Sequence, residues 1–251
     1  MAEEATGTQL ADVRALLFDT FGTVVDWRGG IAREVQGFLT RHGIEGDPGD
    51  FADRWRSFYQ PAMEEIRKGL RPFTRLDVLH RENLERALLS WNIDPTRFAR
   101  EELDELNLAW HRLDPWPDSL EGLRSLRRRF LIAPLSNGNI LLLTNMAKRA
   151  AIPWDCILGA EVVRAYKPQP AAYLHTADVL GLRPEQCMMV AAHNDDLAAA
   201  AAVGMRTGFL LRATEHGPGQ TTDLEPAGPW DVVADNMVDL AAKLTAASTP
   251  A

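Results

Sequence analysis

The sequence is poor in cysteine and has no excess of positive charge. Its 251 residues include only two cysteines, Cys156 and Cys187, which are too few for a disulfide framework and are followed by apolar residues. We therefore expect two buried thiols rather than a cross-link. The formal net charge of -8 argues against a nucleic-acid partner, because DNA and RNA bind to positively charged surfaces. An anionic small molecule would need a local group of arginines and lysines.

Long apolar runs are also missing. No stretch approaches the length that crosses a bilayer, and the first residues lack the charged-then-apolar pattern of a secretory signal. We therefore expect a soluble, cytoplasmic protein that does not contact a membrane. The remaining composition, 46% hydrophobic and 25% charged, is that of an ordinary globular protein. Residues 1–10 are polar and without periodicity, which predicts a loose tail.

The first predicted strand covers residues 13–18 and stops at Asp19. It is a nearly continuous apolar run, which is typical of a buried strand in a parallel sheet. Ligands of open α/β sheets bind just beyond the carboxyl ends of the strands, where Asp19 would lie. Gly22, in the turn that follows, would allow the backbone to approach a neighbour closely. On this stretch alone, an aspartate that only caps a loop is an equally good interpretation.

From residue 27 onward the apolar side chains recur at helical spacing. The pattern predicts helices within residues 31–39, 51–66, 76–89 and 98–110, and Gly43 stands where the first of them would end. No convincing strand occurs between residues 27 and 114. The sequence therefore predicts a helical insertion after the first strand.

Strands and helices alternate after residue 114. Strands are predicted at residues 131–135, 157–162, 188–191, 209–211 and 231–234, with helices between and after them. This alternation predicts an α/β fold with a Rossmann-like parallel sheet. We expect a core domain of residues 1–26 and 115–251 and a helical domain of residues 27–114. Pro134 conflicts with its predicted interior strand, and residues 215–230 are predicted to form a long loop.

Polar side chains follow the predicted strand ends. They are Asp19 with Thr23, Ser136 with Asn137, Lys167, and Asp196. A nucleophilic carboxylate needs a cation and hydrogen-bond donors that keep it ionised and oriented. Lys167 could supply the charge, and Asp196 could hold Lys167 or help to activate water. Each residue alone is more often structural, but their convergence on one sheet edge predicts a catalytic site.

The chain resembles the haloacid dehalogenase superfamily in four ordered motifs. These are Asp19-Thr-Phe-Gly-Thr23, Ser136-Asn-Gly138, Lys167-Pro168 and the region that ends at Asp196. The resemblance implies that the helical insertion is the cap domain of that superfamily. It also implies that Asp19 is the nucleophile.

Two positions resemble the L-2-haloacid dehalogenases rather than the phosphatases of the superfamily. The phosphatases carry a second aspartate two residues after the nucleophile, where this chain has Phe21. They also carry a Mg²⁺-binding aspartate where this chain has Ala192. Phenylalanine cannot transfer a proton, and alanine offers no oxygen to a hard cation. The resemblance therefore implies an enzyme without a metal or another cofactor.

The resemblance also assigns the residues of the pocket. Arg56 follows a tryptophan, as does the arginine that contacts the halogen in the family, and Tyr173 matches a pocket tyrosine. Without the resemblance, Arg56 would be interpreted as a solvated helix charge and Tyr173 as a core residue. Ala191 and His193 replace a serine and an asparagine of the family, so the polarity near the last motif differs.

The implied reaction is hydrolysis of a short 2-haloalkanoate, a small halogenated carboxylate. Asp19 would displace the halide at C2 with inversion, and water would then hydrolyse the aspartyl ester. The other assignments are Thr23, Lys167 and Asp196 to the catalytic machinery, and Arg56, Ser136, Asn137, Phe21, Tyr173 and His193 to the substrate and halide. A Mg²⁺-dependent phosphatase and a non-catalytic binding protein of the same fold remain alternatives. The sequence leaves a homodimer open.

Overall fold

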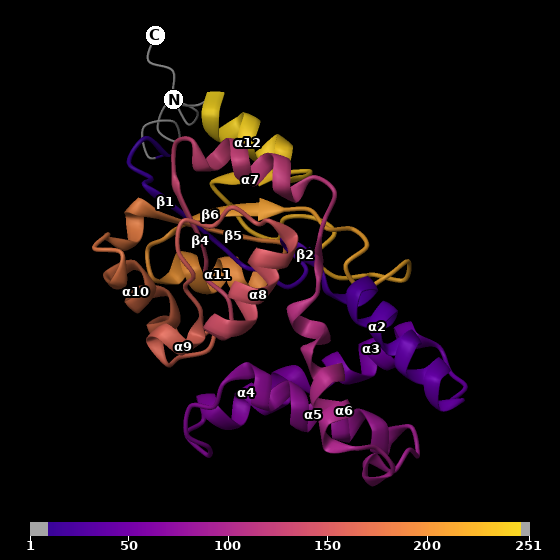
Figure 1. The fold of residues 1–251 in the computed structure, drawn as a ribbon. Coiled ribbons are helices and arrows are strands. Elements are labelled where there is room, and N and C mark those ends of the chain that lie inside the picture. Colours follow the sequence, from indigo (N-terminus) through magenta and orange to yellow (C-terminus); the bar gives the residue numbers. More distant parts are fainter. Residues whose placement is uncertain (1–9, 247–251) are drawn as a thin grey trace.

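A parallel five-stranded sheet forms the centre of the computed structural model, which describes residues 10–246 (Figure 1). The predicted tail lies outside these residues except for Leu10. The strand order is β4-β1-β5-β6-β7. The bounds are Ala15–Phe18 for β1, Leu131–Pro134 for β4, Cys187–Ala191 for β5, Arg206–Leu210 for β6 and Val232–Ala234 for β7. The predicted α/β fold is confirmed.

Helices cover both faces of this sheet, with α7 and α12 on one side and α10 and α11 on the other (Figure 1). Their bounds are Ser119–Arg127 for α7, Met237–Ala246 for α12, Pro170–Val179 for α10 and Asn194–Ala202 for α11. Successive side chains of β1 alternate between these two layers, so that Leu16 and Phe18 face one and Ala15 and Leu17 the other. Burial on both faces explains why this strand is a continuous apolar run.

The helical insertion packs together beside these layers (Figure 1). Its helices are α2 (Trp27–His42), α3 (Pro48–Ser57), α4 (Tyr59–Arg67), α5 (Leu76–Ser90) and α6 (Arg100–Asn107), with short 3-10 turns η1 (Pro95–Arg97) and η2 (Leu108–His111). Two short antiparallel strands, β2 (Val25–Asp26) and β3 (Asp114–Pro115), pair where the insertion leaves and rejoins the core. The division into two domains remains a prediction.

The predicted helix of residues 51–66 is in fact two helices. Helix α3 ends at Ser57, and α4 begins at Tyr59. Pro61 explains the break, because proline has no N–H to donate and its ring clashes with the carbonyl group four residues earlier, that of Ser57. The predicted helix of residues 98–110 is likewise divided into α6 and the turn η2.

The strand predicted at residues 157–162 is wrong. A short helix, α9 (Ala160–Val163), lies there, and Gly159 makes only an isolated bridge to Ser136. Of the apolar residues that suggested a strand, Leu158 is buried against the sheet instead, and Ile157 and Val162 are partly buried. The chain is close-packed at this point, because a Cβ atom on Gly159 would overlap the carbonyl oxygen of Gly138. Lys167 therefore follows a helix and a loop rather than a strand.

Pro134 lies in an edge strand rather than in the predicted interior strand. In the described sheet, β4 pairs only with β1 and stands at one end of the strand order. An edge strand tolerates proline, because one row of its backbone groups needs no partner in the sheet. The remaining helices, α8 (Ile140–Ala150) and the 3-10 turn η3 (Pro184–Gln186), follow β4 and precede β5.

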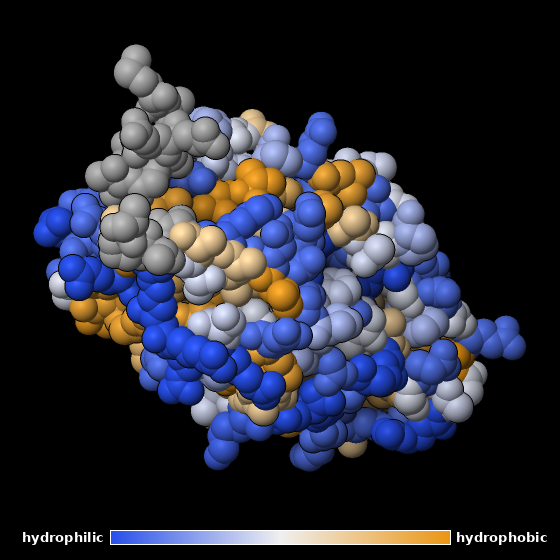
Figure 2. Space-filling view, turned by 90° about the horizontal axis from the view of Figure 1, so that it is seen from above, coloured by the Kyte–Doolittle hydropathy of each residue, from blue (hydrophilic) through white to orange (hydrophobic). Residues whose placement is uncertain are grey.

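The surface that carries α7 and α12 is a mosaic of hydrophilic and apolar side chains (Figure 2).

Among residues 10–246, no helix combines the length and the apolar character needed to cross a lipid bilayer. Cys187 is a buried free thiol, as expected, whereas the free thiol of Cys156 is only partly buried.

Candidate active site

Asp19 lies directly after β1 and is 7% exposed. Its Oδ2 accepts a hydrogen bond from the Thr23 hydroxyl at 2.8 Å, and its Oδ1 lies 2.9 Å from the Lys167 ammonium. Lys167 also pairs with Asp196. The Thr23 hydroxyl oxygen accepts the N–H of Ala192, so its proton is directed at Asp19. The structure thus brings together Asp19, the predicted nucleophile, and the three residues that were predicted to support it.

The charges of this cluster keep Asp19 ionised. Burial opposes ionisation, but Lys167 and His193 outweigh it and hold the pKa of Asp19 well below its usual range. Burial would also lower the pKa of Lys167, but Asp19 and Asp196 raise it above the ordinary lysine value. The pKa of Asp196 is raised, because burial and the charge of Asp19 exceed the effect of Lys167. An ionised carboxylate beside a retained cation is suited to nucleophilic attack.

Asp196 lies in the first turn of α11, not in the loop after β5 where the sequence had placed it. Its Oδ1 accepts a hydrogen bond from the Tyr173 hydroxyl at 2.6 Å. Burial and the charge of Asp196 raise the pKa of Tyr173, so the phenol keeps its proton. Tyr173 therefore holds the carboxylate that in turn holds Lys167.

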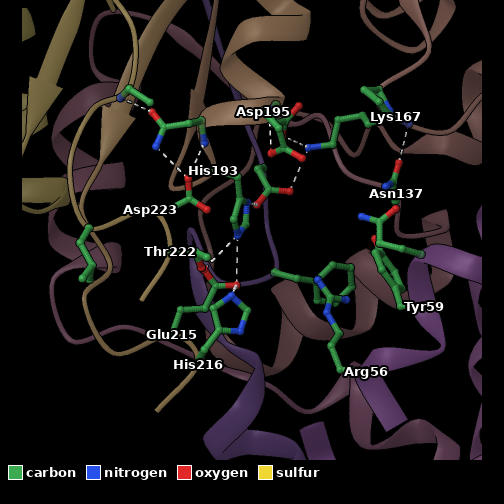
Figure 3. Close-up of a pocket in the computed structure, with 18 of the residues that line it drawn as sticks. Arg56, Tyr59, Asn137, Lys167, His193, Asp195, Glu215, His216, Thr222 and Asp223 are labelled. Atoms are coloured by element: carbon green, nitrogen blue, oxygen red, sulfur yellow. Dashed lines mark hydrogen bonds and ion pairs between the residues drawn. The ribbon is translucent and has the colours of Figure 1, made fainter. Parts of the chain in front are cut away.

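A cavity of about 1100 Å³ opens beside Asp19. It lies between the core, the helical insertion and the loop of residues 215–230, and Figure 3 shows side chains from all three around it. The predicted site residues that line it are Asp19, Phe21, Arg56, Asn137, Lys167, Tyr173, His193 and Asp196.

Arg56 is not a solvated helix charge. Its guanidinium carbon lies 3.9 Å from the ring centroid of Tyr59, 5.2 Å from that of Trp27 and 5.6 Å from that of Phe21. Its Nη1 is buried and has no hydrogen-bond partner among the described residues. A cation that rests on aromatic faces with an unsatisfied N–H is prepared to bind an anion.

The two polar residues of the motif that follows β4 lie in different places. Asn137 lines the cavity, and its Oδ1 accepts the backbone N–H of Lys167 at 2.8 Å, which fixes the orientation of the amide. Ser136 lies behind it, outside the large cavity, and its Oγ accepts the N–H of Gly138 at 3.1 Å. The contact between Ser136 and the substrate carboxylate remains a prediction.

Glu215 is a site residue that the sequence analysis missed. It is 2% exposed and lies 2.9 Å from His193 Nε2, while Trp27 Nε1 donates to its Oε1 at 2.9 Å. His193 Nδ1 lies 3.3 Å from Asp19 Oδ2. Burial opposes protonation of His193, but Glu215 and Asp19 raise its pKa well above the ordinary value. No local pattern marked Glu215, because its loop has neither periodicity nor a motif.

Gly22 leaves the space that Glu215 occupies. Its φ angle is +90°, and a Cβ atom at this position would overlap the Glu215 carboxylate. The close approach expected of Gly22 is therefore confirmed, and its neighbour is a buried carboxylate from a distant loop.

Replacement of Lys167 by methionine should shift the acidic limb of the pH–rate profile for halide release to higher pH. The lysine cation favours ionised Asp19, so its loss raises the pKa of Asp19, and the repulsion of Asp196 adds to this rise. The profile is measured by halide release from pH 4 to 9, that is, across roughly the range in which such groups titrate. Lys148→Met, an exposed lysine on α8, is the control. An unshifted limb with the rate intact would contradict the role of Lys167.

A model of the haloacid dehalogenase-like hydrolase family matches residues 13–204. The chain belongs to this family. Within it, a crystallised defluorinating L-2-haloacid dehalogenase is 57% identical, with a TM-score of 0.92 over 93% of this chain and 95% of its own. The (S)-2-haloacid dehalogenase 4A of Burkholderia cepacia is 26% identical over 78% of this chain and 81% of its own. Phosphoglycolate phosphatase 1 of Pseudomonas aeruginosa is 25% identical over 90% of this chain and 78% of its own.

Proposed function

We propose that the protein hydrolyses short (S)-2-haloalkanoates to 2-hydroxyalkanoates and halide, with inversion at C2. The observation that carries this proposal is the pairing of two groups in one cavity. Asp19 is an ionised carboxylate, and Arg56 is a cation with an unsatisfied buried N–H among aromatic rings. A nucleophile on one side of C2 and a halide site on the other are what backside displacement requires. The similarity to L-2-haloacid dehalogenases supports the same conclusion.

The residues act in two half-reactions. An oxygen of Asp19 forms a bond to C2 while the carbon–halogen bond breaks and the halide leaves toward Arg56 and Asn137. Thr23 and Lys167 orient Asp19 during this attack, and the aromatic rings exclude bulk water from it. Water then attacks the Cγ of the ester, which releases the hydroxy acid and returns Asp19.

The decisive experiment is halide release over a panel of 2-haloacids. The panel contains fluoroacetate, because the relative at 57% identity is a defluorinating enzyme, and both enantiomers of 2-chloro- and 2-bromopropionate. We expect turnover of the (S) enantiomers alone and (R)-lactate as the product on a chiral column. Single turnover in ¹⁸O-water should place the first label in Asp19. Label that enters the product directly would contradict the ester intermediate.

The rival function is a Mg²⁺-dependent phosphatase, which the similarity to the Pseudomonas enzyme favours. Phe21 and Ala192 weigh against it, because they replace the proton donor and the metal-binding carboxylate that the phosphatases carry. A haloacid presents one negative charge and a neutral reacting carbon, which arginine and lysine can accommodate without a metal.

We therefore expect halide release to be unchanged in excess EDTA. We also expect no phosphatase activity on p-nitrophenyl phosphate or phosphoglycolate with added Mg²⁺. The two assays on one preparation distinguish the two functions, because Mg²⁺ would be needed to neutralise charge between a carboxylate and a phosphate. Loss of halide release on chelation that Mg²⁺ restores would overturn the metal-free mechanism.

A further inference from the structure

His193 places one ring nitrogen on each of two carboxylates. Nδ1 lies 3.3 Å from Asp19 Oδ2, and Nε2 lies 2.9 Å from Glu215 Oε2. Figure 3 shows the imidazole at the wall of the cavity with its contacts to Glu215. Its side chain is 21% exposed, so protons can exchange between the ring and solvent in the cavity.

Asp196 is the other group beside Asp19 that could take a proton from water, but each of its oxygens already contacts a donor. Oδ1 accepts the Tyr173 hydroxyl, and Oδ2 pairs with Lys167. Protonation of Asp196 would remove the charge that pairs with Lys167 and would weaken both contacts. Protonation of His193 at Nδ1 carries no such loss, because the group in front of that nitrogen is the Asp19 carboxyl itself.

We propose that His193 is the general base of ester hydrolysis and that Glu215 is the positioning residue that holds it. This proposal rests on the proposed function and deepens it for the second half-reaction. It assigns no part in ester formation to either residue. Asp196 keeps the task of holding Lys167.

The protons balance as follows. Ester formation removes the negative charge of Asp19, so the Nδ1 proton of His193 loses its partner and leaves to solvent. Nε2 keeps its proton and donates it in a hydrogen bond to Glu215. The deprotonated Nδ1 then presents its lone pair to the ester. Water attacks Cγ of Asp19 and gives a proton to Nδ1. The Cγ–O bond to the substrate breaks, and the departing alkoxide takes that proton. The Asp19 carboxylic acid then protonates His193 and restores the original pair.

The neighbours of Glu215 fix its carboxylate in position beside His193. Trp27 Nε1 fixes Oε1, and the missing side chain of Gly22 makes room for the carboxylate. Burial would raise the pKa of Glu215, but His193 lowers it, so the pair is ionised when Asp19 is free. A buried carboxylate that orients an imidazole also stabilises the imidazolium that forms when water gives up its proton.

The test separates the two half-reactions in Glu215→Gln by rapid quench with a 2-haloacid in single turnover. We expect the variant to release halide at close to the wild-type rate. Ester hydrolysis should be at least about tenfold slower, with the aspartyl ester visible by intact mass. His193→Asn should slow hydrolysis by about 100-fold or more, as is common when a general base is lost. Glu121→Gln, which changes an exposed carboxylate on α7 outside the cavity, should alter neither step.

The pH profile of ester hydrolysis adds a measurement that a purely structural role would leave unmoved. The charged or titratable groups that face or adjoin His193 are Asp19, Glu215, His216, Lys167 and Asp195. Asp19 carries no charge in the ester. Among these, the charge of Glu215 favours the imidazolium. Its removal lowers the pKa of His193, so the acidic limb of the hydrolysis rate should move to lower pH in Glu215→Gln.

Two results would overturn the proposal. One is a hydrolysis rate in folded Glu215→Gln within about twofold of the wild type, and the other is equal slowing of both steps without ester accumulation. If Glu215→Gln melts below the assay temperature, His193→Asn decides on the same measurements. A wild-type enzyme that releases no halide from any 2-haloacid would instead refute the proposed function.

Discussion

Asp19→Asn should abolish turnover while the protein stays folded. We expect kcat to fall by at least about 10⁴-fold, because a neutral amide is a poor nucleophile and no other carboxylate can replace it in position. The remaining carboxylate of the cluster, Asp196, is held by Tyr173 and Lys167 and cannot reach the same point. Halide release and the intact mass of the protein are measured together, so that slow deamidation back to aspartate is recognised.

Asp178→Asn is the matched control for this variant. Asp178 is an exposed aspartate on α10 that does not line the cavity, so its change removes the same charge outside the site. Its activity and thermal midpoint should equal those of the wild type. More than a few per cent of wild-type halide release by undeamidated Asp19→Asn would show that another group attacks the substrate.

The sheet and most helices could be predicted from the sequence because their signals are local. Apolar runs marked the buried strands β1 and β5, and helical spacing marked α2 and α5. The errors arose where burial came from tertiary packing. The apolar run near Leu158 is buried against the sheet without joining it, and the edge position of β4 that allows Pro134 depends on the strand order.

The candidate site likewise contains residues that local motifs predict and residues that only tertiary packing reveals. Asp19, Thr23, Lys167 and Asp196 could be located because each belongs to a short motif, and the structure brings them together. Glu215 could not, because its role depends on where a loop of irregular conformation returns to the core. The surroundings of Arg56 could not be predicted either, since its aromatic neighbours come from segments far apart in the chain.

The second large effect is expected in Arg56→Ala and follows from the proposed halide-binding role of Arg56. We expect kcat/KM for 2-chloropropionate to fall by about 10²- to 10³-fold, because a desolvated cation at the leaving group acts where charge develops. The loss should be larger for chloride than for bromide, since the poorer leaving group depends more on that cation. Stability should also fall slightly, by about 1 kcal/mol or less, because the guanidinium no longer rests on Tyr59.

Arg54→Ala provides the matched control, because it removes an arginine from the same helix that also rests on an aromatic ring. Arg54 lies 4.7 Å from the ring centroid of Phe58 and donates to Ser90, away from the cavity. It should lose packing without losing activity. Arg56→Lys keeps the charge but cannot spread it over the ring of Tyr59, so its activity should lie between those of the wild type and the alanine variant. If Arg56→Ala and Arg54→Ala release halide at the same rate, loss of the arginine in the cavity has no effect of its own on the reaction. The halide must then leave toward another group.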